Sequence, residues 1–296
     1  MKSALVGIVG RPSAGKSTLM NRLCGAKISI VSPVPQTTRN RVRGILTRPE
    51  GQLVFMDTPG FHLSEKKLNR YLTDLVSVTL GDSDIVLYIV DGTRPFGDEE
   101  RALLAKLRSS AKPCVIAINK SDQKGHSRQG HSWKEIRSSV AEALPAAALH
   151  EVSALEGNGV EDLASALMAM APEGDQLYPD EFYTDQDPPF RIAEIIREKA
   201  IAHTREELPH ALYVRLEDLE MSESGERLHV RGFILVERES QKGIVVGRGG
   251  DKIRAIVSEA ENELRGIFPY PVDLDLRVKV DRDWRKKDPL LKKMIR

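Results

Sequence analysis

The chain has 296 residues, a length that predicts two domains at roughly 150 residues each. Its 41% hydrophobic and 29% charged residues are typical of a soluble globular protein, and no apolar run approaches the roughly 18 residues that a membrane span needs. The net charge of +1 gives no indication of a polyanionic partner. Two distant cysteines, Cys24 and Cys114, exclude a disulfide framework and a cysteine zinc site, and fit a reducing cytosol.

Short apolar runs alternate with helical patterns over residues 1–172. Strands buried on both faces are predicted where the apolar residues are continuous, at 4–9, 53–57, 84–91, 114–119 and 149–154. Each run is followed by a segment with apolar residues at helical spacing. This alternation predicts an α/β domain with a mainly parallel sheet and helices on both faces, and "VRGILT" (42–47) is expected as an extra edge strand.

A glycine-rich loop, "GRPSAGKS" (10–17), follows the first predicted strand and opens a helix, which is the context that the phosphate-binding pattern G-x-x-x-x-G-K-[S/T] requires. Its glycines let the backbone turn inward, so that amides of residues 13–17 and the helix N-terminus face phosphate oxygens. Lys16 is expected to reach the β- and γ-phosphates and the Ser17 hydroxyl to bind Mg²⁺. The expected nucleotide contacts in this loop are Gly10, Ser13, Ala14, Gly15, Lys16, Ser17 and Thr18.

The motif "DTPG" (57–60) ends the next strand. Asp57 stands where a carboxylate holds Mg²⁺ through water, and the Gly60 amide is placed to sense a γ-phosphate. Ligands bind at the carboxyl ends of the strands in an open α/β sheet, so this motif is expected beside the glycine-rich loop.

Two further motifs predict the base that is bound. In "NKSD" (119–122), Asn119 and Asp122 supply the amide and carboxylate that a guanine edge requires, because adenine lacks the two donors that Asp122 would accept from. Lys120 is expected to lie over the base. In "SAL" (153–155), which comprises Ser153, Ala154 and Leu155, the Ala154 amide is expected to reach guanine O6.

These motifs resemble the small GTPase superfamily over residues 4–171. In that superfamily a threonine between the glycine-rich loop and "DTPG" closes over the γ-phosphate and Mg²⁺. The segment "PQTTRNR" (35–41) offers Thr38 as the first choice and Thr37 as the alternative. The resemblance thus implies that Lys16, Thr38 and Gly60 act on the γ-phosphate and that Ser17, Thr38 and Asp57 form the Mg²⁺ site.

An acidic stretch with several prolines (173–189) interrupts the alternation and is predicted to be a linker. A helix, two alternating strands around "MSESGE", two more helices and a last strand follow, so residues 190–281 are expected to form an α-β-β-α-α-β domain. The remaining residues, 282–296, carry seven basic and two acidic side chains. That basic tail is expected to bind RNA, to contact a membrane or to stay solvated.

A second glycine loop, "VGRGGDKI" (246–253), lacks the Gly-Lys-Ser of a nucleotide loop. It matches the GXXG loop of a KH domain, which clamps the backbone of about four unpaired nucleotides, although a plain helix-helix turn would also use glycine. Residues 241–296 carry 14 basic and nine acidic side chains, a balance that favours nucleic acid. Val245 is expected in the apolar floor of the groove, and the expected RNA contacts are Ile244, Val246, Gly247, Arg248, Gly249, Gly250, Lys252 and Ile253.

The order of secondary structure around this loop resembles a type II KH fold, and the combination of both domains resembles the Era family. That resemblance implies a monomeric cytoplasmic GTPase that uses GTP, GDP and Mg²⁺ and binds the 3′ end of 16S rRNA on the small ribosomal subunit. It leaves open a peripheral contact with the inner membrane. A competing hypothesis is a constitutive RNA-binding module whose nucleotide domain is only structural.

Hydrolysis is expected to be slow, because Phe61 stands where many GTPases have a water-positioning glutamine. The hydrophobic residue resembles the Era branch. Members of that branch usually have an asparagine, associated with potassium, where this chain has Ser13, and this difference puts potassium binding in doubt. His62 lies nearby and is expected to be an exposed side chain without a catalytic role.

Overall fold

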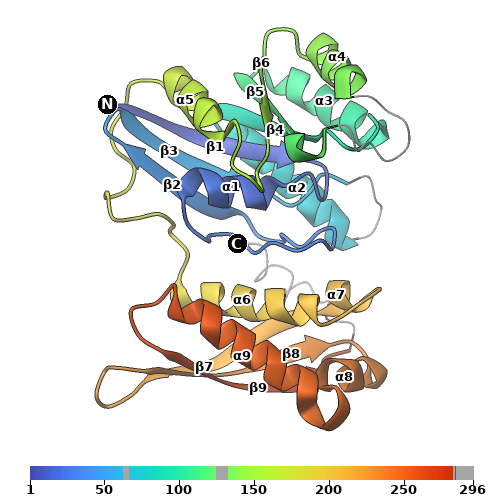
Figure 1. Cartoon of the computed structure of the whole chain (residues 1–296), viewed down its shortest axis with the longest axis vertical. Helices are drawn as coiled ribbons and strands as arrows, with labels where there is room; N and C mark the ends of the chain where they lie inside the picture. The colour runs from blue at the N-terminus through green and yellow to red at the C-terminus, as the bar shows by residue number, and fades with distance from the viewer. Residues whose placement is uncertain (63–66, 125–132, 283, 285–296) are drawn as a thin grey trace. The chain divides into compact units, whose positions relative to one another are not determined.

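The computed structural model describes residues 1–62, 67–124, 133–282 and 284. The basic side chains from Arg285 onward lie outside the described residues, so the predicted tail is largely untested. The chain divides after Asp185 into two compact units, which are described separately below (Figure 1). Among the described helices, none is both long enough and apolar enough to cross a bilayer.

The first unit is built on a single sheet with the strand order β2-β3-β1-β4-β5-β6. All neighbouring strands are parallel except β2, which runs antiparallel to β3, so the predicted parallel sheet and its extra edge strand are confirmed. The strands are β1 (Lys2–Gly10), β2 (Val42–Arg48), β3 (Gly51–Asp57), β4 (Ile85–Asp91), β5 (Cys114–Asn119) and β6 (Ala148–Val152). The helices are α1 (Lys16–Cys24), α2 (Lys67–Asp82), α3 (Asp98–Ser110), α4 (Trp133–Ala143) and α5 (Val160–Met170), with a short 3₁₀ turn at Ser121–Gln123.

Helices cover both faces of this sheet, with α1 and α5 on one face and α2, α3 and α4 on the other (Figure 1). The central strands β3 and β4 are buried along their whole length, as their continuous apolar sequence predicts. One core cluster joins Val9 and Val86 of the sheet to apolar side chains of α2, α3 and α4, and it contains Phe61. The residue that follows Gly60 is therefore part of the hydrophobic core.

The acidic stretch predicted as a linker is held along the edge of the first unit over residues 172–185, and we call this segment the strap. It begins where the Ser3 N–H donates to the Pro172 carbonyl at 3.0 Å. The side chain of Gln52, fully buried at the start of β3, accepts from the Leu177 and Tyr178 amides and donates to the Tyr178 carbonyl, at 2.8 to 3.0 Å.

The end of the strap is bonded to the edge strand β2. The Ile45 N–H donates to the Tyr183 carbonyl at 2.9 Å, and the Thr184 hydroxyl donates to the Arg43 carbonyl at 2.7 Å. The Arg43 guanidinium forms an ion pair with Asp185 at 2.7 Å. The strap thus satisfies polar groups that an edge strand would otherwise present to solvent.

The second unit has the predicted order of elements, with one added short helix. It comprises α6 (Pro188–Ala202), α7 (Leu208–Ala211), β7 (Tyr213–Met221), β8 (Leu228–Val236), α8 (Glu239–Val246), a 3₁₀ turn (Arg248–Gly250), α9 (Asp251–Arg265) and β9 (Val272–Val280). Helix α6 begins at Pro188, where the Asp187 carboxylate caps the helix by accepting from the Phe190 N–H at 3.1 Å. The helix therefore starts two residues before the predicted domain boundary.

The sheet of the second unit has the order β7-β8-β9, with an antiparallel hairpin β7-β8 and β9 parallel to β8. Burial alternates along β8 over residues 228–234, because one face of the sheet packs on α6 and α9, through β7 and β9, and the other faces away. Trp284 is completely buried, donates its indole N–H to the Ala211 carbonyl at 2.9 Å, and packs against Tyr213. This side chain extends the folded unit beyond the predicted end at residue 281.

Candidate functional site

The glycine-rich loop lies between β1 and α1, as predicted. Gly15 precedes the first turn of α1 with φ of 92°, a conformation that favours glycine, and a Cβ there would lie 2.2 Å from the Asn119 amide nitrogen. The loop lines an open pocket together with residues of the 30–38 segment and Gly60. Ser13, Gly15, Lys16, Ser17 and Thr18 all line it, and Gly10 and Ala14 belong to the same loop.

Lys16 is buried, and its ammonium group donates to the Arg11 carbonyl at 3.0 Å. Burial lowers the pKa of Lys16 to about 8, although the nearby Asp57 carboxylate opposes the change. A phosphate group placed in the pocket would restore the positive charge of Lys16, because an adjacent anion favours the ammonium form.

We therefore expect nucleotide binding to take up a proton at alkaline pH. With a pKa of about 8, Lys16 is mostly neutral at pH 8.5 before binding, so that binding should take up about three quarters of a proton there and far less at pH 7. Calorimetric titration of GDP in buffers of different ionisation enthalpy measures this uptake. Lys16→Arg, which stays charged, is the control, and equal uptake in both proteins would contradict the assignment.

The three residues predicted to hold Mg²⁺ come together beside Lys16. The Ser17 hydroxyl donates to Asp57 Oδ2 at 2.6 Å and lies 2.9 Å from the Thr38 hydroxyl. Thr37 also lines the pocket, but its hydroxyl donates to the Val34 carbonyl at 2.6 Å. Of the two candidate threonines, the structure thus places Thr38 at the site.

The Asp57 carboxylate has the surroundings that a cation would complete. It is fully buried, and its Oδ1 atom has no hydrogen-bond partner in the part of the chain described here. Burial raises the pKa of Asp57, while Lys16 and the hydroxyls of Ser17 and Ser29 oppose the rise. An unpaired buried oxygen is costly, so the donor set of one carboxylate and two hydroxyls fits Mg²⁺.

The guanine motifs converge at the ends of β5 and β6. Asn119 joins them to the glycine-rich loop, since its Nδ2 donates to the Ala14 carbonyl at 2.8 Å and its Oδ1 accepts from the Ala154 N–H at 2.9 Å. The Ser153 hydroxyl donates to Asp122 Oδ1 at 2.6 Å and leaves Oδ2 for a ligand. The Ala154 amide expected to reach guanine O6 is engaged by Asn119 here, and Leu155 is 63% exposed.

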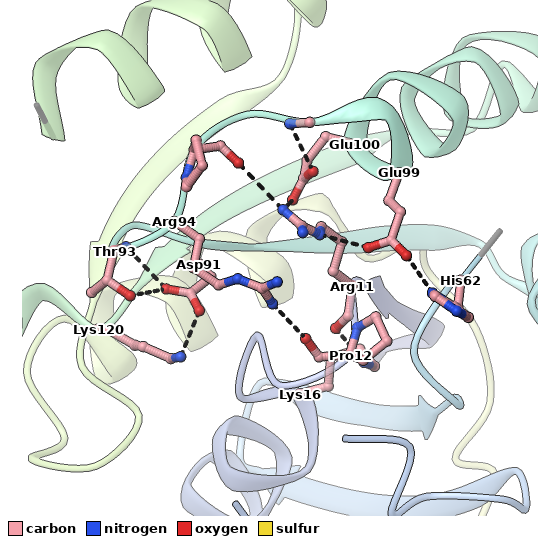
Figure 2. A network of polar contacts seen from close by, with 12 residues as sticks. Arg11, Pro12, Lys16, His62, Asp91, Thr93, Arg94, Glu99, Glu100 and Lys120 are labelled. Carbon is pink, nitrogen blue, oxygen red and sulfur yellow. Dashed lines mark hydrogen bonds and ion pairs between the residues drawn. The ribbon is translucent and has the colours of Figure 1, made fainter. Parts of the chain in front are cut away.

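Two residues that hold this site lie outside the predicted motifs. Asp91 lies at the end of β4 and accepts from the Lys120 ammonium at 2.6 Å, which fixes the side chain expected over the base (Figure 2). Ser29 donates to Asp57 Oδ2 at 3.0 Å. Asp91 could have been found from its place at a strand's carboxyl end, whereas no pattern in the sequence marks Ser29.

The "DTPG" motif is pinned to the glycine-rich loop. Gly60 lies so close to Pro12 that a Cβ would be 2.5 Å from the proline Cα, and the Phe61 N–H donates to the Gly10 carbonyl at 3.0 Å. The Phe61 ring points into the core and is 1% exposed. It therefore cannot orient an attacking water.

The GXXG loop of the second unit connects α8 to α9. Gly247, Gly249 and Gly250 have φ values of 77°, 57° and 81°, so each adopts a conformation that favours glycine. Arg248 is exposed between them, and Arg254 donates to the Gly249 carbonyl at 2.8 Å. The loop thus presents backbone and one cation outward.

The apolar side chains beside this loop differ in exposure. Ile244 is 49% exposed, and Val246, Lys252 and Ile253 are half-buried. Val245 is fully buried in the core, so it is unavailable for the groove floor in which it was expected.

Comparisons with known proteins give matches to both units. A family model described as a 50S ribosome-binding GTPase matches residues 5–120, and one described as a KH domain matches residues 207–285. The chain is 49% identical to GTPase Era of Treponema denticola over 99% of each protein, and 42% identical to GTPase Era of Borreliella afzelii over the full length of both.

Two solved structures, each 32% identical in sequence, cover 99% of this chain and 98% of their own. One is a variant of Aquifex aeolicus Era bound to GDP·AlF4⁻, with a TM-score of 0.93. The other is an Era in complex with MgGDPNP and nucleotides 1506–1542 of 16S ribosomal RNA, with a TM-score of 0.91.

Proposed function

Because this chain belongs to the Era family of GTPases, we propose that it binds and hydrolyses GTP and that its nucleotide state controls how the KH domain binds the 3′ end of 16S ribosomal RNA during small-subunit assembly. The observation that carries the proposal is the convergence of Ser17, Thr38 and the unpaired Asp57 oxygen beside Lys16. The Era structure with bound 16S RNA nucleotides supports the choice of RNA.

In this proposal the residues of the first unit divide the work on the triphosphate. Lys16 neutralises charge on the β- and γ-phosphates, and Thr38 and the Gly60 amide respond to the γ-phosphate. Mg²⁺, held by Ser17, Thr38 and Asp57, would supply further positive charge at the phosphate oxygens. The base is selected by Asp122, held in place by Ser153, while Asn119 ties the base site to the phosphate loop.

Hydrolysis should be slow without a partner, because Phe61 is buried and brings no hydrogen-bonding group to the attacking water. Potassium binding stays in doubt, because Ser13 stands where this branch usually has an asparagine. Ser13 is exposed and has a φ of 63°.

The strap supplies a route from the nucleotide to the second unit. Strand β2 follows directly on the segment that carries Thr38, and the strap is bonded to β2 at Arg43 and Ile45. A shift of that segment on loss of the γ-phosphate would move β2 and the strap with it. The strap in turn leads into α6 of the KH domain.

This proposal predicts that RNA affinity depends on the nucleotide. We expect at least a roughly fivefold difference between complexes with a non-hydrolysable GTP analogue and with GDP, the lower end of common allosteric couplings. Fluorescence anisotropy with an RNA of the 16S 3′ sequence measures both affinities. In Lys16→Ala, which loses its main phosphate contact, the difference should vanish.

The competing proposal is a constitutive RNA-binding module. It predicts equal RNA affinity with both nucleotides and unchanged subunit assembly in cells that carry Lys16→Ala. Either result would overturn the switch without affecting RNA binding itself. A membrane contact is one of the alternatives for the basic tail, most of which lies outside the described residues. It would appear as binding of the full chain to anionic vesicles, whereas a solvated tail would not bind them.

A further inference from the structure

One carboxylate, that of Glu99 in the first turn of α3, joins two parts of the nucleotide site that are far apart in sequence. Its Oε2 atom accepts from the Arg11 guanidinium of the glycine-rich loop at 2.9 Å. Its Oε1 atom contacts Nδ1 of His62, the second residue after Gly60 (Figure 2). Each oxygen thus holds a different segment.

The surroundings make this bridge rigid. Arg11 and Glu99 are mostly buried, and Arg11 is also held by Glu100 at 2.7 Å and by the Pro95 carbonyl at 3.3 Å (Figure 2). Burial opposes the charge on Arg11, but the hydrogen bonds and charges of Glu100 and Glu99 outweigh it and raise the pKa of the guanidinium. The two glutamates also lie at the N-terminus of α3, where the helix dipole favours negative charge.

The position of His62 brings the bridge next to the "DTPG" motif. Gly60 packs on Pro12 and Phe61 points into the core, so His62 is the first polar side chain after Gly60. Its side chain is 41% exposed. A carboxylate on Nδ1 fixes the ring orientation and leaves Nε2 as the nitrogen that can meet water or substrate.

We propose that Glu99 is a positioning residue for GTP hydrolysis. It holds His62, two residues after Gly60, against the phosphate loop through Arg11. The inference rests on the proposed GTPase activity. It goes beyond that activity by naming the contact that orients His62 in a chain that has Phe61 where many GTPases have a water-positioning glutamine. Glu99 acts on His62 and Arg11 and does not itself touch the nucleotide.

The test compares Glu99→Gln with Asp98→Asn in the full chain. Asp98 is the preceding acidic residue of the same helix turn, is 84% exposed, and pairs with Arg101 on its own helix. Both variants remove one negative charge from the N-terminus of α3. We expect Glu99→Gln to lower kcat for GTP by at least about tenfold, since small misplacements near the chemistry cost that much, with KM and GDP affinity within about twofold of wild type. Asp98→Asn should leave all three unchanged.

A double-mutant cycle with His62→Asn identifies the contact through which Glu99 acts. If Glu99 orients His62, the double variant should lose no more kcat than His62→Asn alone. Three results would each overturn the inference. The losses of kcat in the two single variants could add in the double variant, Glu99→Gln and Asp98→Asn could have equal kcat values, or Glu99→Gln could lose GDP affinity in parallel with kcat. If thermal unfolding shows that Glu99→Gln is not folded, His62→Asn is measured alone. An unchanged kcat in His62→Asn would refute the proposed role of Glu99. Absence of hydrolysis in wild type would instead refute the proposed function.

Discussion

Replacing Gly249 and Gly250 together by aspartate should lower RNA affinity by roughly 100-fold, or about 2.7 kcal/mol. Both glycines lie in the GXXG loop, where a nucleic acid backbone would approach closely, and two carboxylates would repel its phosphates. Because both positions have positive φ, each substitution also strains the folded loop by about 1 kcal/mol. RNA binding and thermal unfolding should therefore be measured on the same preparations.

The β7-β8 turn offers a matched control for that experiment. Gly225 has a φ of 73°, Gly249 has a φ of 57°, and a Cβ at either position would meet nothing within 4 Å. Gly225→Asp and Gly249→Asp thus add the same charge to the same unit at a similar backbone strain. We expect only Gly249→Asp to weaken RNA binding, and equal effects of the two variants would refute the assignment of the loop.

Changing Asp122 to asparagine should reverse the choice of nucleotide. The carboxylate would accept from both donors of the guanine edge, and hydrogen bonds to a charged group contribute about 1.5–3 kcal/mol each, so GTP affinity should fall by at least about 100-fold. Xanthine has a carbonyl in place of the exocyclic amine. An asparagine amide can donate to that carbonyl, so the variant should bind XTP more tightly than wild type does.

The gain of XTP affinity is the decisive measurement for Asp122, because a misfolded protein cannot acquire a new ligand. Competition binding with GTP, XTP and ATP on wild type and variant gives all the ratios. Ser153→Ala removes the 2.6 Å hydrogen bond to Asp122. It should lower the affinity for GTP by about tenfold without raising the affinity for XTP. If Asp122→Asn loses affinity for GTP without gaining affinity for XTP, the Asp122 carboxylate does not recognise the base.

The sequence predicts which side chains lie together where they follow a strand end. Lys16, Asp57 and Asn119 each belong to a motif at the carboxyl end of a strand, and parallel strands bring such ends together. The sequence favours Thr38 over Thr37 only as a first choice, because the sides to which two neighbouring residues point depend on the path of the backbone. The same holds for Val245, which shares a helix with exposed Ile244 but faces the core.

Contacts made by side chains from distant segments were not predictable either. Glu99 and Arg11 are 88 residues apart, and neither belongs to a spacing that marks a bridge. Gln52 is polar within a buried strand, yet nothing in the sequence indicates that its amide would bond to Leu177 and Tyr178. Such contacts depend on where the whole chain runs, whereas a motif depends on a few neighbouring residues.

The hydrogen bonds of the strap also determine the length of the connection between the two units. Asp185 is tied to Arg43, and α6 starts at Pro188, so Gln186 and Asp187 connect the last ion pair of the strap to the helix. Fully extended, they span only about 7 Å, and Asp187 is restricted further by the proline that follows it. While the strap stays bound, the connection between the two units therefore stays short. Releasing the strap would lengthen this connection by residues 172–185. The GXXG loop could then reach RNA within a larger volume.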